Sequence, residues 1–209
     1  MKSSNPWTEI DIEIYEGHMS YDGVQQLQML NAIYKEQIGT YSMPKIMILG
    51  SAGGNGLEHI DWDKTKKVYC IDINESYIET IKRRFTMGGI DCICEDLINL
   101  KQSLPHSDVV LANLLIEYIG VEKIKEVLDK VKPTIFSCVI QIEDTKGFVS
   151  ISPYIDSMRV LEDLFIPVNK ELLRQCIECL GYSITCEKLY ILPNGKELMR
   201  IDYHRNLNS

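Results

Sequence analysis

The sequence lacks any apolar run that approaches the roughly 20 residues needed to span a bilayer. Its first residues, Met1-Lys2-Ser3-Ser4-Asn5-Pro6, lead into an acidic stretch and do not form the pattern of a secretory signal peptide. We therefore expect a cytoplasmic protein that makes no use of a membrane.

Clusters of basic residues are also missing. The formal net charge is −8, and the longest basic runs are only Lys64–Lys67 and Lys82–Arg84. A field of this sign repels phosphate backbones. Nucleic acid is therefore not expected as a partner, whereas a neutral or cationic small molecule is accommodated more easily.

No set of metal ligands accompanies the seven cysteines. Cys176 and Cys179 have a CxxC spacing, but a zinc site needs four ligands, and no second CxxC or histidine pair follows. Disulfides are unusual in the cytoplasm. We predict no metal site, and we interpret the cysteines of the expected strands as small buried hydrophobic residues.

The composition is that of an ordinary globular protein, with 45% hydrophobic and 25% charged residues in 209. A loop and then a helix over about Asp22–Gln37, ended by Gly39, are expected first. From Lys45, strands and helices alternate, which is typical of a parallel sheet with right-handed crossovers. The expected strands are Ile46–Leu49, Val68–Ile71, Cys92–Cys94, Asp108–Ala112 and Ile135–Ile142. A short helix is expected after Gly54, and longer helices over Asn74–Phe85 and Val121–Val131.

The end of the chain has a different pattern. A helix is predicted over Asn169–Leu180, and two extended runs then flank Pro193-Asn194-Gly195, where Asn-Gly is a strong hairpin signal. We expect a doubly wound, mostly parallel seven-stranded α/β sheet, Rossmann-like, that closes with an antiparallel hairpin. The expected organisation is a single domain, 1–209, made of a lid (1–40), a cofactor-binding core (45–142), a substrate-side connection (143–167) and a closing helix and hairpin (168–205).

A glycine-rich turn, Gly50-Ser51-Ala52-Gly53-Gly54-Asn55-Gly56, follows the first expected strand. Glycines allow a ligand to approach the backbone closely, and such ligands bind at the carboxyl ends of the strands. Asp72 ends the second strand and can accept hydrogen bonds from both hydroxyls of a ribose, and Asp96 follows the third strand. Together these residues point to a ligand that contains adenosine.

The chain here resembles the class I S-adenosylmethionine-dependent methyltransferases. The resemblance covers about half of the chain, in the stretches Ile46–Ile60, Val68–Ile73, Glu95–Leu97, Asp108–Ile119 and Val121–Gln141, and the final hairpin looks like the family's last two strands. It implies S-adenosylmethionine as cofactor, with the methionine part near the glycine turn, the ribose at Asp72, and the adenine at Asp96 and Leu97. The implied cofactor-binding residues are Gly50, Ser51, Ala52, Gly54, Asn55, Asp72, Ile73, Asp96, Leu97 and Asn113.

Two positions depart from the family pattern. Ile48 stands where an acidic residue usually precedes the first glycine, and Ala52 replaces the middle glycine. The amino group of the cofactor then needs another partner, such as a backbone carbonyl or Asn113. A similar Gly-x-Ala-x-Gly-Asn-Gly turn occurs in a subgroup of bacterial methyltransferase-like proteins, mostly of unassigned substrate.

Two other functions stay open. The spacing of Gly50, Gly54 and Gly56 also matches short-chain NAD(P)-dependent oxidoreductases, but their Tyr-x-x-x-Lys occurs only as Tyr41–Lys45, which contains Pro44 and cannot form the required helix. The third possibility is a catalytically silent S-adenosylmethionine-binding protein, because a fold does not fix a function.

Methyl transfer from a sulfonium is an in-line displacement, so alignment and exclusion of water are the main tasks of the protein. We predict Glu117, Tyr15 and His18 as catalytic candidates, against the alternatives of a surface carboxylate for Glu117 and of simple helix packing for the other two. Further substrate-side candidates are Tyr21, Tyr118, Gln141 and Tyr154. The sequence has no Asn-Pro-Pro-Tyr run, the amine-binding motif of enzymes that methylate adenine or glutamine nitrogen. We expect a small-molecule acceptor, and a monomer or homodimer.

Overall fold

The computed structural model describes residues 5–142 and 149–206, and in this part of the chain one seven-stranded sheet has the order β3-β2-β1-β4-β5-β7-β6. Strands β1 to β5 pair in parallel, and β7 runs antiparallel to both β5 and β6. The strands are β1 (Lys45–Leu49), β2 (Lys67–Asp72), β3 (Ile90–Cys94), β4 (Val109–Asn113), β5 (Ile135–Ile142), β6 (Tyr182–Ile191) and β7 (Glu197–Arg205).

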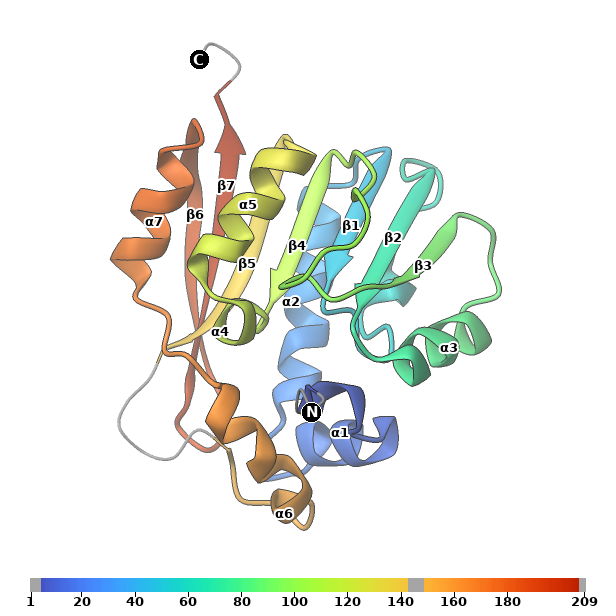
Figure 1. The fold of residues 1–209 in the computed structure, drawn as a ribbon, viewed down its shortest axis with the longest axis vertical. Coiled ribbons are helices and arrows are strands. Elements are labelled where there is room, and N and C mark those ends of the chain that lie inside the picture. The colour runs from blue at the N-terminus through green and yellow to red at the C-terminus, as the bar shows by residue number, and fades with distance from the viewer. Residues whose placement is uncertain (1–4, 143–148, 207–209) are drawn as a thin grey trace.

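Helices lie on both faces of this sheet, and others lie below the carboxyl ends of its parallel strands (Figure 1). The α-helices are α1 (Ile12–Ser20), α2 (Gln26–Thr40), α3 (Glu75–Arg84), α4 (Ile116–Ile119), α5 (Val121–Val131), α6 (Ile155–Met158) and α7 (Lys170–Glu178). Short 3-10 helices are η1 (Pro6–Thr8), η2 (Leu57–His59) and η3 (Arg159–Leu164). Among the described residues, no helix is both long and apolar enough to cross a membrane.

The central strands are apolar on both sides because each side of the sheet is covered. In β1, Met47 and Leu49 pack into the core formed with α5 and α7, whereas Ile46 and Ile48 pack into the core formed with α2 and α3. All four side chains are buried. Continuous apolar strands of this kind are expected in a parallel sheet, so the sequence pattern and the layers agree.

The predicted fold class is confirmed, and several element boundaries match closely. Asn74 and Asn169 cap α3 and α7 through their side chains, as their positions in the sequence indicated. The fifth strand and the helix Val121–Val131 have the predicted bounds. The Asn-Gly turn joins β6 to β7, which pair as the predicted hairpin.

The N-terminal prediction was partly wrong. A loop was expected before Asp22, but Asp11 caps α1 there, and α2 begins at Gln26 and continues through Gly39 to Thr40. Only Ile12, His18 and Met19 of α1 are buried, so the helix has no apolar stripe from which its periodicity could be recognised. The helix predicted after Gly54 is the short 3-10 turn η2.

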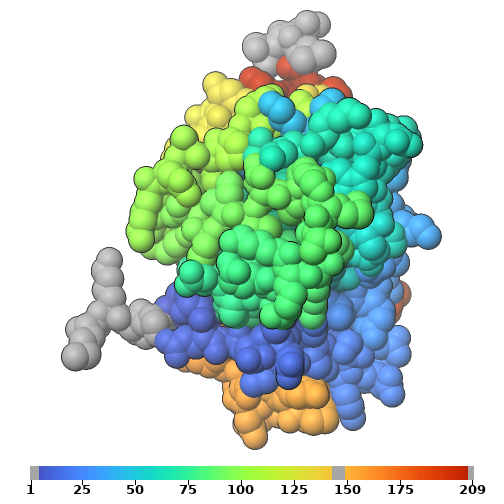
Figure 2. Space-filling model, turned by 90° about the vertical axis from the view of Figure 1, so that its right-hand side faces the viewer, coloured from blue at the N-terminus to red at the C-terminus, as the bar shows by residue number. Residues whose placement is uncertain are grey.

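The order of strands reverses between β1 and β4, which is where doubly wound sheets bind their ligands. Beneath the carboxyl ends of these strands, α1 and α6 lie side by side (Figure 1). Figure 2 shows the N-terminal residues, in dark blue, between the body of the molecule and the orange segment that follows residue 150. Helices α1 and α6 therefore cover the carboxyl ends of the central strands, where the glycine turn lies.

Candidate functional site

The glycine turn leaves β1 in a conformation that ordinary residues avoid. Gly50 has φ +67°, and a Cβ there would lie 3.1 Å from the Leu115 side chain. Ala52 also has a positive φ, +43°, which is uncommon for a residue with a side chain. The chain therefore keeps a left-handed backbone at the family's middle glycine position although alanine occupies it.

Asp72, at the end of β2, holds this turn. One carboxylate oxygen accepts a hydrogen bond from the Ala52 N–H at 2.8 Å, and the other accepts one from the Asn74 N–H at 3.0 Å. Burial raises the pKa of Asp72 to about 6, although these backbone donors act in the opposite direction. An ionised carboxylate offers about four acceptor positions, so the backbone donors do not use all of them. Asp72 can thus support the turn and still accept ligand hydroxyls.

Carboxylates after β3 form the adjoining wall. Asp96 lines the cavity, but its oxygens accept hydrogen bonds from the Ile98 N–H and the Asn99 side chain, at 2.9 and 2.8 Å. Glu95 also lines it, is buried, and accepts a bond from the Lys101 N–H at 3.2 Å. Leu97 supplies an apolar surface beside them. Glu95 was not predicted as a site residue, since its only signal in the sequence is its place beside Asp96.

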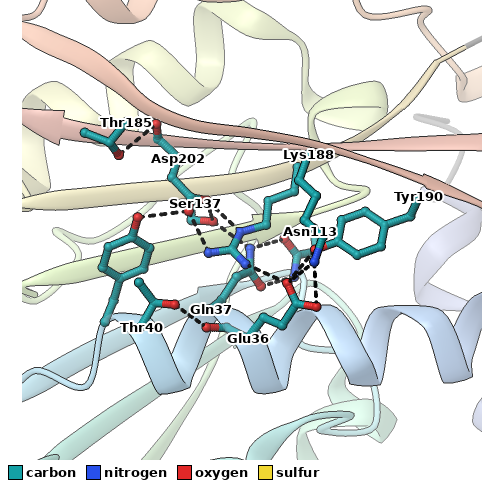
Figure 3. Close-up of polar contacts among 11 residues, drawn as sticks. Glu36, Gln37, Thr40, Asn113, Ser137, Thr185, Lys188, Tyr190 and Asp202 are labelled. Atoms are coloured by element: carbon teal, nitrogen blue, oxygen red, sulfur yellow. Dashed lines mark hydrogen bonds and ion pairs between the residues drawn. The ribbon is translucent and has the colours of Figure 1, made fainter.

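Asn113 ends β4, and its side chain is fixed from behind. Its amide group donates to the Gln37 Oε1 at 2.8 Å and accepts from the Gln37 Nε2 at 3.0 Å, so the two amides pair face to face (Figure 3). Gln37 Nε2 also donates to Ser137 Oγ at 2.7 Å. Both amides are buried. Helix α2 therefore sets the orientation of a residue that lines the cavity.

Farther from the cavity, the same network ends on a buried ion pair. Asp202 on β7 accepts hydrogen bonds from Ser137 Oγ, from the Arg200 guanidinium at 2.8 and 2.6 Å, and from the Tyr41 hydroxyl at 2.9 Å. A carboxylate is only an acceptor, so Ser137 must donate to it and accept from Gln37. This places Gln37 Nε2 toward Ser137 and thereby fixes the orientation of both paired amides.

Glu117, on α4, is a buried acidic residue that lines the cavity beside β5. Its side chain is 1% exposed, so the surface alternative weighed from the sequence is wrong. Oε1 accepts a hydrogen bond from the Gln141 N–H at 2.7 Å, whereas Oε2 is buried with no hydrogen-bond partner. Burial raises the pKa of Glu117 to about 7. Glu117 and Gln141 both line the cavity.

Helix α1 brings Tyr15 and His18 over the cavity. Tyr15 contacts the Tyr77 ring, with centroids 5.9 Å apart, and burial raises the pKa of its hydroxyl. The His18 Nδ1 lies 2.7 Å from Ser152 Oγ. Burial and the charge of Lys196 lower the pKa of His18, which favours the neutral imidazole.

Five predicted site residues lie outside the lining of the cavity. Asn55 donates to the Leu27 carbonyl at 3.0 Å and so ties the glycine turn to the start of α2. Gly54 is needed for packing, because a Cβ there would lie 2.7 Å from the Phe85 ring. Tyr21 and Tyr154 are exposed and Ser51 is buried beside the turn. Proximity in sequence suggested these residues, but none of the five lines the cavity.

Two aromatic residues were missed. Trp7 and Tyr77 line the cavity, and Trp7 packs edge-to-face on Tyr118 with centroids 4.9 Å apart. Trp7 is brought in by Asn74, whose side-chain amide donates to the Trp7 and Ile10 carbonyls at 2.9 and 3.1 Å. Trp7 lies in a segment without helical or strand periodicity, so the sequence gives no signal for this contact.

The cavity has about 1300 Å³ of empty space, its open mouth included. No Lys or Arg is found among the described residues that line it. The lining does hold Asp72, Glu95, Asp96 and Glu117.

Residues 48–134 match a family model described as a methyltransferase domain. A search of curated proteins found no match.

Solved structures share the fold at low identity. A SAM-dependent methyltransferase from Leishmania major has a TM-score of 0.68 at 10% identity, over 94% of this chain and 80% of that chain. Magnesium protoporphyrin IX methyltransferase from Synechocystis PCC 6803, solved with bound SAH, has a TM-score of 0.61 at 12% identity, over 93% and 86%. The [4+2]-cyclase SpnF has a TM-score of 0.64 at 12% identity, over 92% and 88%.

Proposed function

We propose that the chain, whose residues 48–134 match a methyltransferase-domain model, binds S-adenosylmethionine in the cavity between α1 and the carboxyl ends of the strands and transfers the methyl group to a small molecule. The observation that carries this proposal is Asp72. Its carboxylate supports the glycine turn and retains acceptor positions at the carboxyl end of β2, where a ribose would lie.

The donor set of the cavity fits this cofactor. S-adenosylmethionine carries a sulfonium and an ammonium group against one carboxylate, and it supplies an already activated methyl group when bound. A lining with four carboxylates and no described Lys or Arg suits such a cation. The rings of Tyr15 and Tyr77 offer faces on which a sulfonium can be stabilised.

We assign the remaining roles by position. Gly50 and Ala52 would hold the methionine part, and Asp96 with Leu97 and Ile73 would border the adenine. Asn113 keeps a second lone pair on Oδ1 beyond its bond to Gln37, and this can accept from the cofactor's ammonium group. That contact would replace the acidic residue that is missing at Ile48.

The oxidoreductase alternative is weakened by where its candidate pair lies. Tyr41 donates its hydroxyl to Asp202, and neither Tyr41 nor Lys45 lines the cavity. The silent-binder alternative stays as the second candidate. The [4+2]-cyclase SpnF shares this fold, so the fold also serves a different reaction.

Calorimetric titration of the protein with S-adenosylhomocysteine, beside NADH, tests the proposal. We expect S-adenosylhomocysteine to bind with micromolar affinity and NADH not to bind, because the turn is flanked by acids and no described cation in the lining receives the additional phosphates. Binding of NADH alone would overturn the proposal. Release of S-adenosylhomocysteine from S-adenosylmethionine in the presence of a small-molecule panel would separate an enzyme from a silent binder.

A further inference from the structure

The acceptor side of the cavity contains a carboxylate oxygen without a partner. Glu117 Oε2 is the only carboxylate oxygen that is buried without a hydrogen bond in the described part of the chain. A buried, unsatisfied acceptor is costly, and native proteins rarely keep one without a function. Because the Gln141 N–H holds the other oxygen at 2.7 Å, the orientation of the carboxylate is fixed. A ligand that donates a proton to Oε2 would satisfy it.

The charge around Glu117 limits which ligands can do this. Asp72, Glu95 and Asp96 share the cavity with Glu117, and no Lys or Arg is found among the described residues of the lining. His18 is the remaining basic group there, and its pKa is lowered, so it does not supply a counter-charge. Lys196 acts on His18 from outside the lining. Anionic groups are therefore disfavoured beside Glu117.

The walls next to Glu117 are apolar and aromatic. Trp7 and Tyr118 meet edge-to-face, and Met158 and Leu161 are both buried beside them. Walls of this kind bind the apolar body of a ligand and leave one polar group to fix its orientation. On this wall, Glu117 Oε2 is a buried acceptor without a hydrogen-bond partner, and Trp7 Nε1 is a buried donor without one.

We propose that the methyl acceptor is an amine on an apolar, aromatic-sized body, whose nitrogen donates a hydrogen bond to Glu117 Oε2. The inference rests on the proposed function, since it concerns the second ligand of the same cavity. Glu117 orients the nitrogen and receives its proton, and Trp7 and Tyr118 contact the apolar body.

Nitrogen fits the charges better than oxygen does. An alcohol or phenol becomes a good nucleophile by losing its proton, which would place another negative charge among the lining carboxylates. An amine is neutral when it attacks and cationic before and after the attack, and each of these states is compatible with the acidic lining. A carboxylate or phosphate acceptor would be repelled throughout.

Methylation of an amine balances without any further reactant. The nitrogen lone pair forms a bond to the methyl carbon, while the bond from that carbon to sulfur breaks with its electron pair remaining on sulfur. Before the attack, the ammonium form of the acceptor loses one proton to Glu117 Oε2, and after the attack the positive charge of the sulfonium lies on the methylated nitrogen. The raised pKa of Glu117, about 7, makes this carboxylate a better proton acceptor than an exposed one.

The test uses three probes of similar shape, 2-phenylethylamine, 2-phenylethanol and phenylacetate. Each is titrated by calorimetry into the full-length protein saturated with S-adenosylhomocysteine. The variants are Glu117→Gln and, as a control with the same change of charge on the neighbouring helix α5, Glu126→Gln, which alters an exposed residue paired with Lys123.

We expect the amine to bind the wild type more tightly than the alcohol and the acid. Glu117→Gln should weaken amine binding by about 10-fold or more, since it removes a charged hydrogen bond. Binding of S-adenosylhomocysteine should stay unchanged in both variants, and Glu126→Gln should bind the amine as the wild type does.

Equal or tighter binding of the alcohol or the acid, an amine affinity that Glu117→Gln leaves unaltered, or no amine binding at millimolar concentration would each overturn the inference. Failure of S-adenosylhomocysteine to bind the wild type would instead contradict the proposed function, so the two failures are distinguishable. Mass-spectrometric detection of N-methylated 2-phenylethylamine with S-adenosylmethionine, and its loss in Glu117→Gln, would give independent support.

Discussion

Asp72 performs two tasks with one side chain. Its carboxylate fixes the left-handed backbone at Ala52, and in the proposed function it also binds the ribose of the cofactor. Both tasks need an ionised acceptor, and the pKa of about 6 places its titration close to neutral pH. Cofactor binding should therefore weaken as the pH falls through about 6 in the free protein.

Substituting Asp72→Ala should lower the affinity for S-adenosylhomocysteine by about 10-fold or more, because hydrogen bonds to a charged acceptor are lost. Calorimetry measures the affinity. The control is Asp91→Ala, which removes an exposed aspartate on β3 that pairs with Lys67 on β2. It should leave the affinity for S-adenosylhomocysteine unchanged. If Asp72→Ala bound as tightly as the wild type, the ribose would have been placed wrongly.

Glu117 predicts an effect of pH on stability. Its pKa rises from the ordinary 4.5 to about 7 in the folded protein because burial disfavours the charged form. The folded state then binds the proton more tightly than the unfolded chain does. The contribution of this group to stability is fully present below 4.5 and is lost as the pH rises through about 7.

Glu117→Gln should accordingly raise the unfolding free energy at pH 8 by up to roughly 3 kcal/mol, the size of a shift of this kind, and change it little at pH 4.5. Urea unfolding at the two pH values measures the difference. Glu126→Gln, on the exposed face of α5, should show no such dependence. A Glu117→Gln effect of the same size at both pH values would contradict the assignment of the raised pKa.

At the scale of elements, α1 and the turn before it are held over the cavity by specific contacts. Asn74 Nδ2 donates to two main-chain carbonyls, those of Trp7 and Ile10, and the Glu16 carboxylate pairs with Arg84 at the end of α3. Arg84 also donates to the Gly53 carbonyl at 3.1 Å, so the same contacts reach the glycine turn. Opening of α1 would therefore expose the proposed cofactor site.

Asn74→Asp should loosen this cover without removing the cap of α3. The aspartate retains an oxygen that accepts from the Ser76 N–H but loses the amide that donates to the Trp7 and Ile10 carbonyls. We expect faster hydrogen exchange in α1, and faster dissociation of S-adenosylhomocysteine, with exchange in β1 and β4 unchanged. Unchanged exchange in α1 would show that Asn74 does not secure it.

Across the whole molecule, one polar network links the closing hairpin to the cofactor cavity. It begins at the ion pairs of Glu36 with Lys188 and Arg200 and passes through Asp202 and Ser137 (Figure 3). From there it reaches the paired amides of α2 and β4 described above. The antiparallel end of the sheet thereby helps to orient a cavity residue on a strand two places away in the sheet.

Asp202→Ala should lower the unfolding free energy by about 3–5 kcal/mol, because it leaves the buried Arg200 guanidinium without its main counter-ion. Thermal or urea unfolding measures the loss. Lys188→Ala, which removes an exposed partner of Glu36, should cost about 1 kcal/mol or less. If the two variants lowered the unfolding free energy by similar amounts, the buried pair of Arg200 and Asp202 would stabilise the fold no more than an exposed pair does.

The sequence by itself determined the alternation of strands and helices, because apolar runs and caps such as Asn74 act over a few residues. It also indicated that Gly50 and Asp72 lie close together, since both stand at strand ends that a parallel sheet must bring to one side. These features depend on local spacing and on a topology that has few alternatives.

Only the tertiary structure decided which side chains face the cavity. It buried Glu117 and left one of its oxygens without a partner, it brought Trp7 over the site, and it placed the Tyr154 ring against Gly17 of α1. It also connected Gln37 to Asp202 across 165 positions of sequence, through Ser137. The physical reason is that burial and hydrogen-bond pairing depend on neighbours that are distant in sequence. The local sequence pattern around a residue does not say which distant residues will be its neighbours.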